Sequence, residues 1–339
     1  SPDHGCGWSF AGGDLAGKLF NDVTIHAEDP AHVLALVSKF AATTDAGITY
    51  TNLIYESHDN GATWSAVGGA LDPTIIAETI DTAKSDPNRL YVSGIRGQGT
   101  NAVGVFLAST DAGKTFTEST ITLVSTDEHA PYIGAVDPTN PDRIYVRIAG
   151  STAGRLLASS DGGKTFTPVF SGPPLFGFAV SPDGAKVFVG ASNGLFEASS
   201  ADLAFAQKSS IQVQCLATSG TRLYACSVES SGFVVGASDD DGSTFTPLLH
   251  LDSLRGPLAC PSGSTGSICL PDWPATAANL GVNIDGGSVD AGSTLPTPSS
   301  QSSGCSCNVP EAKNAGLGAA VTLFVTALTS LLIRRKKKV

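Results

Sequence analysis

Residues 109–116 have the sequence STDAGKTF, and this stretch decides the fold because it recurs along the chain. Its pattern, Ser-x-Asp-x-Gly-x-Thr followed by Trp or Phe, is repeated at residues 57–64, 159–166 and 238–245. The Asp residues stand at 59, 111, 161 and 240, so the steps are 52, 50 and 79 residues, and a degraded copy at 199–205 divides the last step. A period of about 40 to 50 residues with many short strands is typical of propeller blades.

Each unit divides into four short strands. In the third unit, residues 132–136 lead into the turn DPTNPD, residues 143–147 (RIYVR) alternate as a strand, and strands over 155–159 and 165–170 flank the repeated motif. Five units can be drawn this way, beginning near Asn21, Pro73, Pro131, Leu175 and Gln212.

The two ends of the chain add material for a further blade. Residues 256–260 and 268–270 look like strands, and residues 8–10 resemble the outermost strand of a blade. A propeller closes its ring to remove sheet edges, and joining the two chain ends achieves this. We therefore predict an all-β propeller of four-stranded blades over residues 1–280. Six blades, the sixth shared between the termini, are expected, with five or seven as alternatives.

The repeated motif resembles the Asp-box, or bacterial neuraminidase repeat, of sialidases, sortilin-type receptors, some endoglucanases and photosystem assembly factors. An Asp carboxylate can accept backbone N–H groups across a tight turn, and a Gly two residues later allows positive φ. The Thr hydroxyl can cap the loop, and the aromatic residue can pack between blades. Because each copy is self-sufficient, we interpret four carboxylates as structural: Asp59, Asp111, Asp161 and Asp240.

The sequence predicts no metal site and no cofactor. A helix-loop-helix calcium site over residues 237–248 would need Glu at its twelfth position, where Leu248 stands. Neither a Cys-x-x-Cys nor a Cys/His spacing suited to zinc appears. A nucleophile elbow, a phosphate loop and a metal-binding His pair are missing as well.

The meander of a blade distributes its turns between two faces. The repeated motifs and the Asp-Pro turns share one face. The longer loops share the other, here called the long-loop face, at residues 39–52, 94–104, 118–130, 227–232 and 248–257. Long loops on a rigid scaffold are where binding normally resides, and the resemblance implies the same face.

Polar side chains of these loops are the candidate site residues. For ligand binding we predict Arg96, Gln98, His129 and Arg255. The candidates for catalytic acids are Asp127, Glu128 and Asp252. A solvated acidic loop is the plain alternative for residues 127–129.

Two functions from different classes remain open. A sialidase needs three arginines to bind the substrate carboxylate, and the resemblance implies an Arg-Ile-Pro signature, whereas this chain has only Ile95-Arg96-Gly97. An endoglucanase would need two carboxylates flanking a groove, and nothing in the sequence selects them. We therefore favour a non-catalytic recognition or scaffold propeller that binds protein or glycan. A surface glycoside hydrolase of sialidase or endoglucanase type is the alternative.

The net charge of −11 for 339 residues conceals an asymmetry. Residues 1–310 hold 14 bases against 30 acids, and one acid and six bases follow them. Because so acidic a body repels phosphate backbones, nucleic acid is not an expected partner. The chain has no methionine, even at position 1, which we interpret as a mature product whose signal peptide has been removed.

The C-terminal segment predicts export. Residues 316–333 are uncharged and as a helix would span about 27 Å, enough for a bilayer, and the five cations at 334–338 would stay cytoplasmic. Residues 281–310 have the composition of a flexible stalk and include Cys305 and Cys307.

This Cys pair, the helix and the terminal cations resemble the sorting tail of myxobacterial surface proteins. The resemblance implies a sorting protease and a cell-surface location, with residues 311–339 as the transmembrane tail. A permanent single-pass anchor is the alternative. Two hairpin disulfides are also expected outside the cytoplasm, Cys215–Cys226 and Cys260–Cys269, with Cys6 left over.

Overall fold

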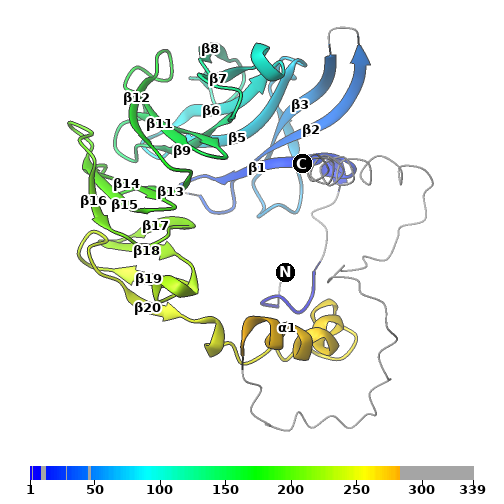
Figure 1. The fold of residues 1–339 in the computed structure, drawn as a ribbon. Helices are drawn as coiled ribbons and strands as arrows, with labels where there is room; N and C mark the ends of the chain where they lie inside the picture. Colours follow the sequence, from blue (N-terminus) through cyan, green and yellow to red (C-terminus); the bar gives the residue numbers. More distant parts are fainter. Residues whose placement is uncertain (2, 9–12, 28, 45–46, 283–339) are drawn as a thin grey trace, which may run out of the picture. The chain divides into compact units, whose positions relative to one another are not determined.

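The computed structural model describes residues 1, 3–8, 13–27, 29–44 and 47–282. These residues form five four-stranded antiparallel sheets, each a meander in chain order, so the all-β prediction is confirmed and the arrangement is consistent with a propeller (Figure 1). The first two sheets contain β1 (Leu19–Ile25), β2 (Val33–Thr44), β3 (Gly47–Ser57) and β4 (Ser65–Val67), then β5 (Ile75–Ala83), β6 (Asp86–Arg96), β7 (Val103–Ser109) and β8 (Thr117–Ile121).

The remaining three sheets follow the same order. The third contains β9 (Glu128–Val136), β10 (Ile144–Gly150), β11 (Gly154–Ser159) and β12 (Thr167–Gly172). The fourth contains β13 (Leu175–Val180), β14 (Lys186–Ala191), β15 (Gly194–Ser199) and β16 (Ala206–Ser209). The fifth contains β17 (Cys215–Ser219), β18 (Arg222–Cys226), β19 (Val235–Ser238) and β20 (Thr246–Leu249). Each of the five units drawn from the sequence therefore corresponds to one sheet.

The hydrophobic core lies between consecutive sheets. In β10, Ile144, Val146 and Ile148 pack in the cluster shared with the second sheet, whereas Tyr145 packs in the cluster shared with the fourth. Successive side chains of a strand point to opposite faces, so a strand buried on both faces is a continuous apolar run. Clusters of the same kind join the first sheet to the second and the fourth sheet to the fifth.

The innermost strands of neighbouring sheets are also joined by side-chain hydrogen bonds. Asp22 of β1 accepts the Ile80 N–H of β5 at 3.0 Å, and Thr79 Oγ1 of β5 accepts the Ile133 N–H of β9 at 2.9 Å. Between β17 and β13, the Thr218 hydroxyl donates to Val180 O at 2.8 Å. These bonds fix one sheet against the next where no strand ladder connects them.

The predicted sixth blade is not formed by the described residues. Residues 256–260 lie in no strand, and residues 268–270 lie in the 3₁₀ helix η5 (Thr265–Asp272), which α1 (Trp273–Leu280) follows. The segment contains prolines, which lack the N–H of a strand ladder, at positions 257, 261, 271 and 274. Trp8 is exposed, and residues 9–10 lie outside the described residues.

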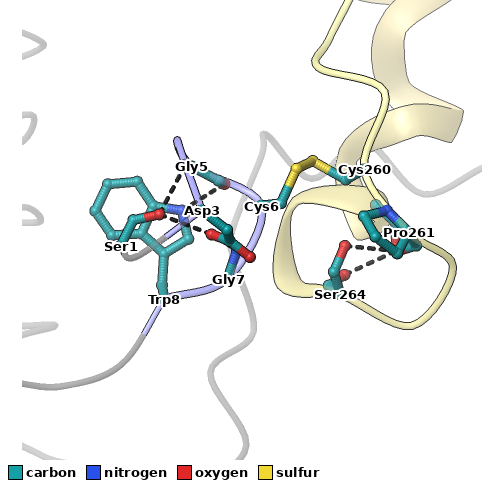
Figure 2. The surroundings of a disulfide bond; sticks show 10 residues. Ser1, Asp3, Gly5, Cys6, Gly7, Trp8, Cys260, Pro261 and Ser264 are labelled. Atoms are coloured by element: carbon teal, nitrogen blue, oxygen red, sulfur yellow. Dashed lines mark hydrogen bonds between the residues drawn. A yellow bond between two sulfur atoms is a disulfide. The ribbon is translucent and has the colours of Figure 1, made fainter.

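Two disulfides hold this part of the chain. Cys215 and Cys226, the pair expected from the sequence, are joined across β17 and β18. The expected Cys260–Cys269 bond is wrong, because Cys260 is joined to Cys6 across a separation of 254 residues (Figure 2). Local spacing favoured Cys269, whereas the fold brings the N-terminal segment against Cys260. Disulfides indicate an oxidising compartment.

Two other expectations from the sequence concern a loop and the tail. Residues 39–52 do not form a loop: β2 and β3 stay paired from Val33↔Ser57 to Thr44↔Gly47, with residues 45–46 outside the description. Residues 283–339, which include Cys305, Cys307 and the predicted transmembrane tail, also lie outside it. Among the described residues, no helix is both long enough and apolar enough to cross a bilayer.

Candidate functional site

All four repeated motifs fold into the same hydrogen-bonded turn, here called the Asp turn. In residues 109–116, Asp111 Oδ1 accepts the Thr115 N–H at 2.9 Å, and Asp111 Oδ2 accepts the Thr115 hydroxyl at 2.6 Å. Ser109 Oγ accepts the N–H of Gly113, whose φ is 84°, at 2.8 Å. The same bonds recur in the turns of Asp59, Asp161 and Asp240. With the Thr115 hydroxyl as the largest cause, these bonds lower the pKa of Asp111 to about 2.

The N-terminus forms a fifth such turn, which was missed in the sequence. The Gly5 N–H donates to Ser1 Oγ at 2.7 Å, and the Gly7 N–H donates to Asp3 Oδ1 at 2.6 Å (Figure 2). Trp8 Nε1 donates to Gly5 O at 2.9 Å, as Trp64 Nε1 donates to Gly61 O at 3.0 Å. The signal was present as Ser-x-Asp-x-Gly before a Trp, but Gly7 stands at the Thr position.

On the long-loop face, a hollow of about 360 Å³ lies between the second and third sheets. It is formed by the β6–β7 loop, the β8–β9 loop, and the innermost strands β5 and β9. Of the predicted site residues, it brings together Gln98, Glu128 and His129. Its apolar lining includes Ile76 and Ile95. A mostly apolar wall with a few polar groups is typical of a ligand site.

Two further polar residues of this hollow were not found in the sequence. Burial raises the pKa of the Glu78 carboxyl, and it also raises the pKa of Tyr132, to which the charge of Glu78 contributes. The Arg147 guanidinium lies 5.9 Å from the Tyr132 ring centroid and donates to Leu175 O and Phe176 O at 3.0 and 2.8 Å. Both Glu78 and Tyr132 belong to alternating strands, where polar residues carry no distinctive sequence signal.

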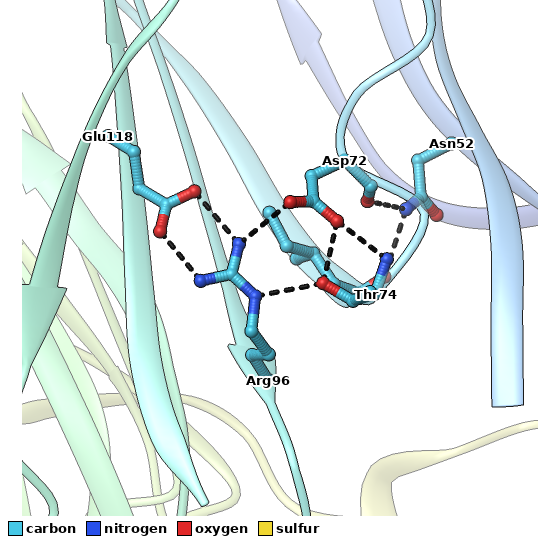
Figure 3. Close-up of polar contacts among 6 residues, drawn as sticks. Asn52, Asp72, Thr74, Arg96 and Glu118 are labelled. Carbon is cyan, nitrogen blue, oxygen red and sulfur yellow. Dashed lines mark hydrogen bonds and ion pairs between the residues drawn. The ribbon is translucent and has the colours of Figure 1, made fainter. Parts of the chain in front are cut away.

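Arg96 does not line the hollow. Its Nη1 and Nη2 donate to the two Glu118 carboxylate oxygens at 2.7 and 2.9 Å, and Nη2 also donates to Asp72 Oδ2 at 3.1 Å (Figure 3). Its Nε donates to Thr74 Oγ1 at 2.9 Å. The guanidinium therefore connects β6 to β8 and to the segment that precedes β5.

Asp127 and Glu128 are held by intramolecular partners. Asp127 accepts the Ser151 hydroxyl, and its Oδ2 accepts the Thr152 N–H at 3.2 Å and the Thr152 hydroxyl at 3.0 Å. These bonds, Ser151 first, lower the pKa of Asp127 to about 2. Glu128 Oε2 accepts Arg155 Nη2 at 2.8 Å and the Val124 N–H at 2.7 Å, and Glu128 Oε1 accepts Arg155 Nε at 2.5 Å.

The last two predicted residues, Asp252 and Arg255, are exposed after β20. Asp252 lies in the 3₁₀ helix η4 (Leu251–Ser253), and neither residue lines the hollow between the second and third sheets. The structure thus assembles three of the seven predicted binding or catalytic residues at one hollow.

The opposite face has its own hollow, of about 420 Å³, at the ends of all five innermost strands. Each of these strands, β1, β5, β9, β13 and β17, contributes to the lining, in this order through Ile25, Asp81, Val136, Val180 and Leu216. Asp81 Oδ1 accepts the Thr82 N–H at 2.8 Å and the Thr24 hydroxyl at 3.3 Å. Burial nevertheless dominates and raises the pKa of Asp81 to about 6.

Comparisons with known proteins show similarity of fold. No protein-family model and no curated protein matches the chain. Among solved structures, a GH74 enzyme of Niastella koreensis is 16% identical, with 67% of this chain and 38% of that chain covered and a TM-score of 0.47. YCF48 bound to D1 peptide is 18% identical, with 68% and 67% covered and a TM-score of 0.42. A nidogen/laminin complex structure is 10% identical, with 69% and 80% covered and a TM-score of 0.45.

The chain spans little more than a third of the length of the GH74 enzyme. At these identities the likeness concerns the fold alone and assigns no role to any residue of this chain.

Proposed function

We propose that the chain is a non-catalytic recognition propeller at the cell surface, which binds a protein or glycan ligand through the hollow of Gln98 and His129. The observation that carries the proposal is that the candidate acids already form hydrogen bonds within the chain. Asp127 and Glu128 each direct both carboxylate oxygens at partners within the chain. A glycosidase needs one protonated acid and one carboxylate available to the sugar.

The location is part of the proposal. The disulfides suit an oxidising compartment, and the composition of residues 311–339 suits a transmembrane sorting or anchor tail. A sorting protease would act near Cys305 and Cys307. The body would then lie outside the membrane with its long-loop face available to other molecules.

A glycoside hydrolase is the second candidate, and Glu78 is the observation that favours it. Its carboxyl, whose pKa burial raises, lies in the same hollow as Glu128. A carboxylic acid with a raised pKa is what protonation of a glycosidic oxygen requires.

One set of variants of the full chain separates the two functions. Wild-type protein is screened on a glycan array, on a displayed-peptide library and with fluorogenic glycosides. Gln98→Ala/His129→Ala should abolish retention of any bound ligand, while Thr221→Ala, at the β17–β18 turn of the opposite face, should retain it. Turnover of a glycoside that Glu78→Gln abolishes would replace the binding proposal by the hydrolase. Retention that survives the double change would place the ligand elsewhere.

A further inference from the structure

Three side chains that can ligate metals meet where the start of β2 and the end of β3 lie side by side in the first sheet, a place here called the corner. His32 immediately precedes β2, Glu56 is the penultimate residue of β3, and His58 lies in the following Asp turn. The pairing of Val33 with Ser57 and of Leu34 with Glu56 brings the three residues together. The order of residues in the sequence gives no hint of this, because Glu56 stands 24 positions after His32.

The distances between these side chains suit a small metal ion. His32 Nε2 and His58 Nε2 each lie 3.4 Å from the same oxygen, Glu56 Oε2. All three ligand atoms lie within 4.8 Å of one another. Ligands about 2.0–2.1 Å from a tetrahedral zinc ion are separated by about 3.4 Å, the edge of that tetrahedron. The two imidazoles stack with centroids 4.2 Å apart and ring planes inclined by 28°. A metal lies in the plane of each imidazole that binds it, so coordination of one ion by both rings requires one ring to turn.

One ligand atom has no adequate partner within the described part of the chain. His32 Nε2 is buried from solvent there, and its distance of 3.4 Å to Glu56 Oε2 is longer than an ordinary N–H···O hydrogen bond. On the other side of His32, the His26 ring stacks at a centroid distance of 5.2 Å and restricts the imidazole's orientation. Buried polar atoms normally have a close partner, and an ion between His32 Nε2 and Glu56 Oε2 would provide one.

The other sheets provide an internal comparison for this corner. The serine of each Asp turn pairs with a residue of the neighbouring strand. The residue just before that strand partner is His32 in the first sheet, Arg89 in the second, Arg143 in the third and Arg222 in the fifth. At the position of Glu56 these sheets have Ala108, Ala158 and Ala237, and at that of His58 they have Thr110, Ser160 and Asp239. Arginine stays protonated and cannot ligate a metal. Only the first of these four corners therefore has a ligand atom at all three positions.

The corner also has an open side. A cavity of about 200 Å³ is lined by Glu56 and His58 together with Asp59, Thr63 and Trp64 of the Asp turn. Zinc sites with three protein ligands leave a fourth position for water or another ligand, and that position would face this cavity.

We propose that His32 Nε2, His58 Nε2 and a Glu56 carboxylate oxygen bind one divalent transition metal, zinc by the chemistry of this ligand set. The site departs from the expectation, drawn from sequence spacing, that the chain has no metal site. It lies on the Asp-turn face, away from the hollow of Gln98 and His129, and does not depend on the proposed ligand function.

The test uses untagged full-length protein that has been treated with chelator and desalted. Titration calorimetry with Zn²⁺ should give one site per chain, and Co²⁺ should give the intense visible absorption of a four-coordinate ion. A variant that copies the second sheet, His32→Arg/Glu56→Ala/His58→Thr, should fold, because that combination already exists in the chain. It should bind Zn²⁺ at least tenfold more weakly and lose the cobalt spectrum. His58→Ala should weaken binding in the same direction.

His250→Ala is the matched control. His250 Nδ1 contacts Glu229 Oε1 at 2.7 Å, which makes an exposed His–Glu pair that has no third ligand among the described residues. This change should leave Zn²⁺ affinity and the cobalt spectrum unaltered. No zinc binding by the wild type, or binding that the triple variant retains in full, would overturn the proposal and leave the corner as an ordinary His–Glu contact.

Discussion

Asp81 shows how burial sets the behaviour of a single carboxyl group. Its pKa is about 6 in the folded protein, against 3.8 for an ordinary Asp, so the folded state binds the proton more tightly than the unfolded state. Stability from this residue is therefore complete below about pH 4 and is lost as the pH rises through about 6. Above that pH the charged group costs the folded state about 1–3 kcal/mol.

Asp81→Asn should remove this loss. The variant is expected to be more stable than the wild type at pH 7 and nearly equal to it at pH 4, as measured by urea denaturation at both values. Asp14→Asn, at an exposed acid of the 3₁₀ helix η1 (Gly13–Leu15), is the control and should change neither. An Asp81→Asn protein less stable than the wild type at pH 7 would contradict a raised pKa.

Glu128 is expected to act on stability, although the sequence suggested an exposed acid. The side chains of Glu128 and Arg155 are 8% and 14% exposed, so Glu128→Gln would leave the arginine charge poorly compensated. We expect a loss of about 2–4 kcal/mol in the free energy of unfolding. Glu118→Gln, at a more exposed carboxylate that shares its arginine with Asp72, should cost less. Equal losses from the two changes would show that burial does not matter here.

At the scale of elements, each Asp turn should stabilise the protein independently of the other Asp turns. Asp111→Ala and Asp161→Ala each remove the hydrogen bonds across one turn and should lower Tm by roughly 2–4 °C apiece. The two losses should add, because the turns belong to separate sheets. Calorimetric scans of both single variants and the double variant measure this. Ligand retention should be unchanged in all three, and its loss at unchanged Tm would place an Asp turn in the binding site.

These turns were predictable because their bonds are local. Ser109, Asp111 and Gly113 stand in one short stretch, so residue type and spacing determine the turn. The fifth copy was overlooked because Gly7 replaces the Thr, although its N–H still donates to Asp3. The prediction of a loop over residues 39–52 was wrong because Thr, Asp and Gly near the tip of this hairpin are residues that hairpins and loops share.

The candidate site could be predicted only in part, because its residues come from segments that are far apart in the sequence. The hollow of Gln98 and His129 is made by loops from two sheets, and the corner of His32 and His58 is made by strand pairing. The local spacing of residues in the sequence predicts neither of these two groups of side chains. Sequence reasoning named two loops that line the first, but it could not show that Asp127 and Glu128 already have partners.

At the scale of the whole molecule, the two disulfides should differ in their effect on stability. Cys215–Cys226 closes a separation of 11 residues, whereas Cys6–Cys260 closes one of 254. In the chain-entropy view, removal should cost about 3 kcal/mol for the short loop and about 5–6 kcal/mol for the long one. Urea denaturation of Cys215→Ala/Cys226→Ala and of Cys6→Ala/Cys260→Ala measures both. A smaller loss for the long-range pair would mean that other contacts already hold the ends together.

The Cys6–Cys260 bond also has a consequence for oxidative folding. Synthesis presents Cys6 first, and its partner follows only after all five sheets have been made, whereas Cys215 and Cys226 can close a local loop as soon as both exist. An unpaired Cys6 thiol would meet the other two before Cys260 becomes available, and mixed pairings formed then can be corrected only by thiolate attack on the wrong bond. The yield of native protein should therefore follow the supply of a disulfide isomerase more closely than the rate at which strands pair.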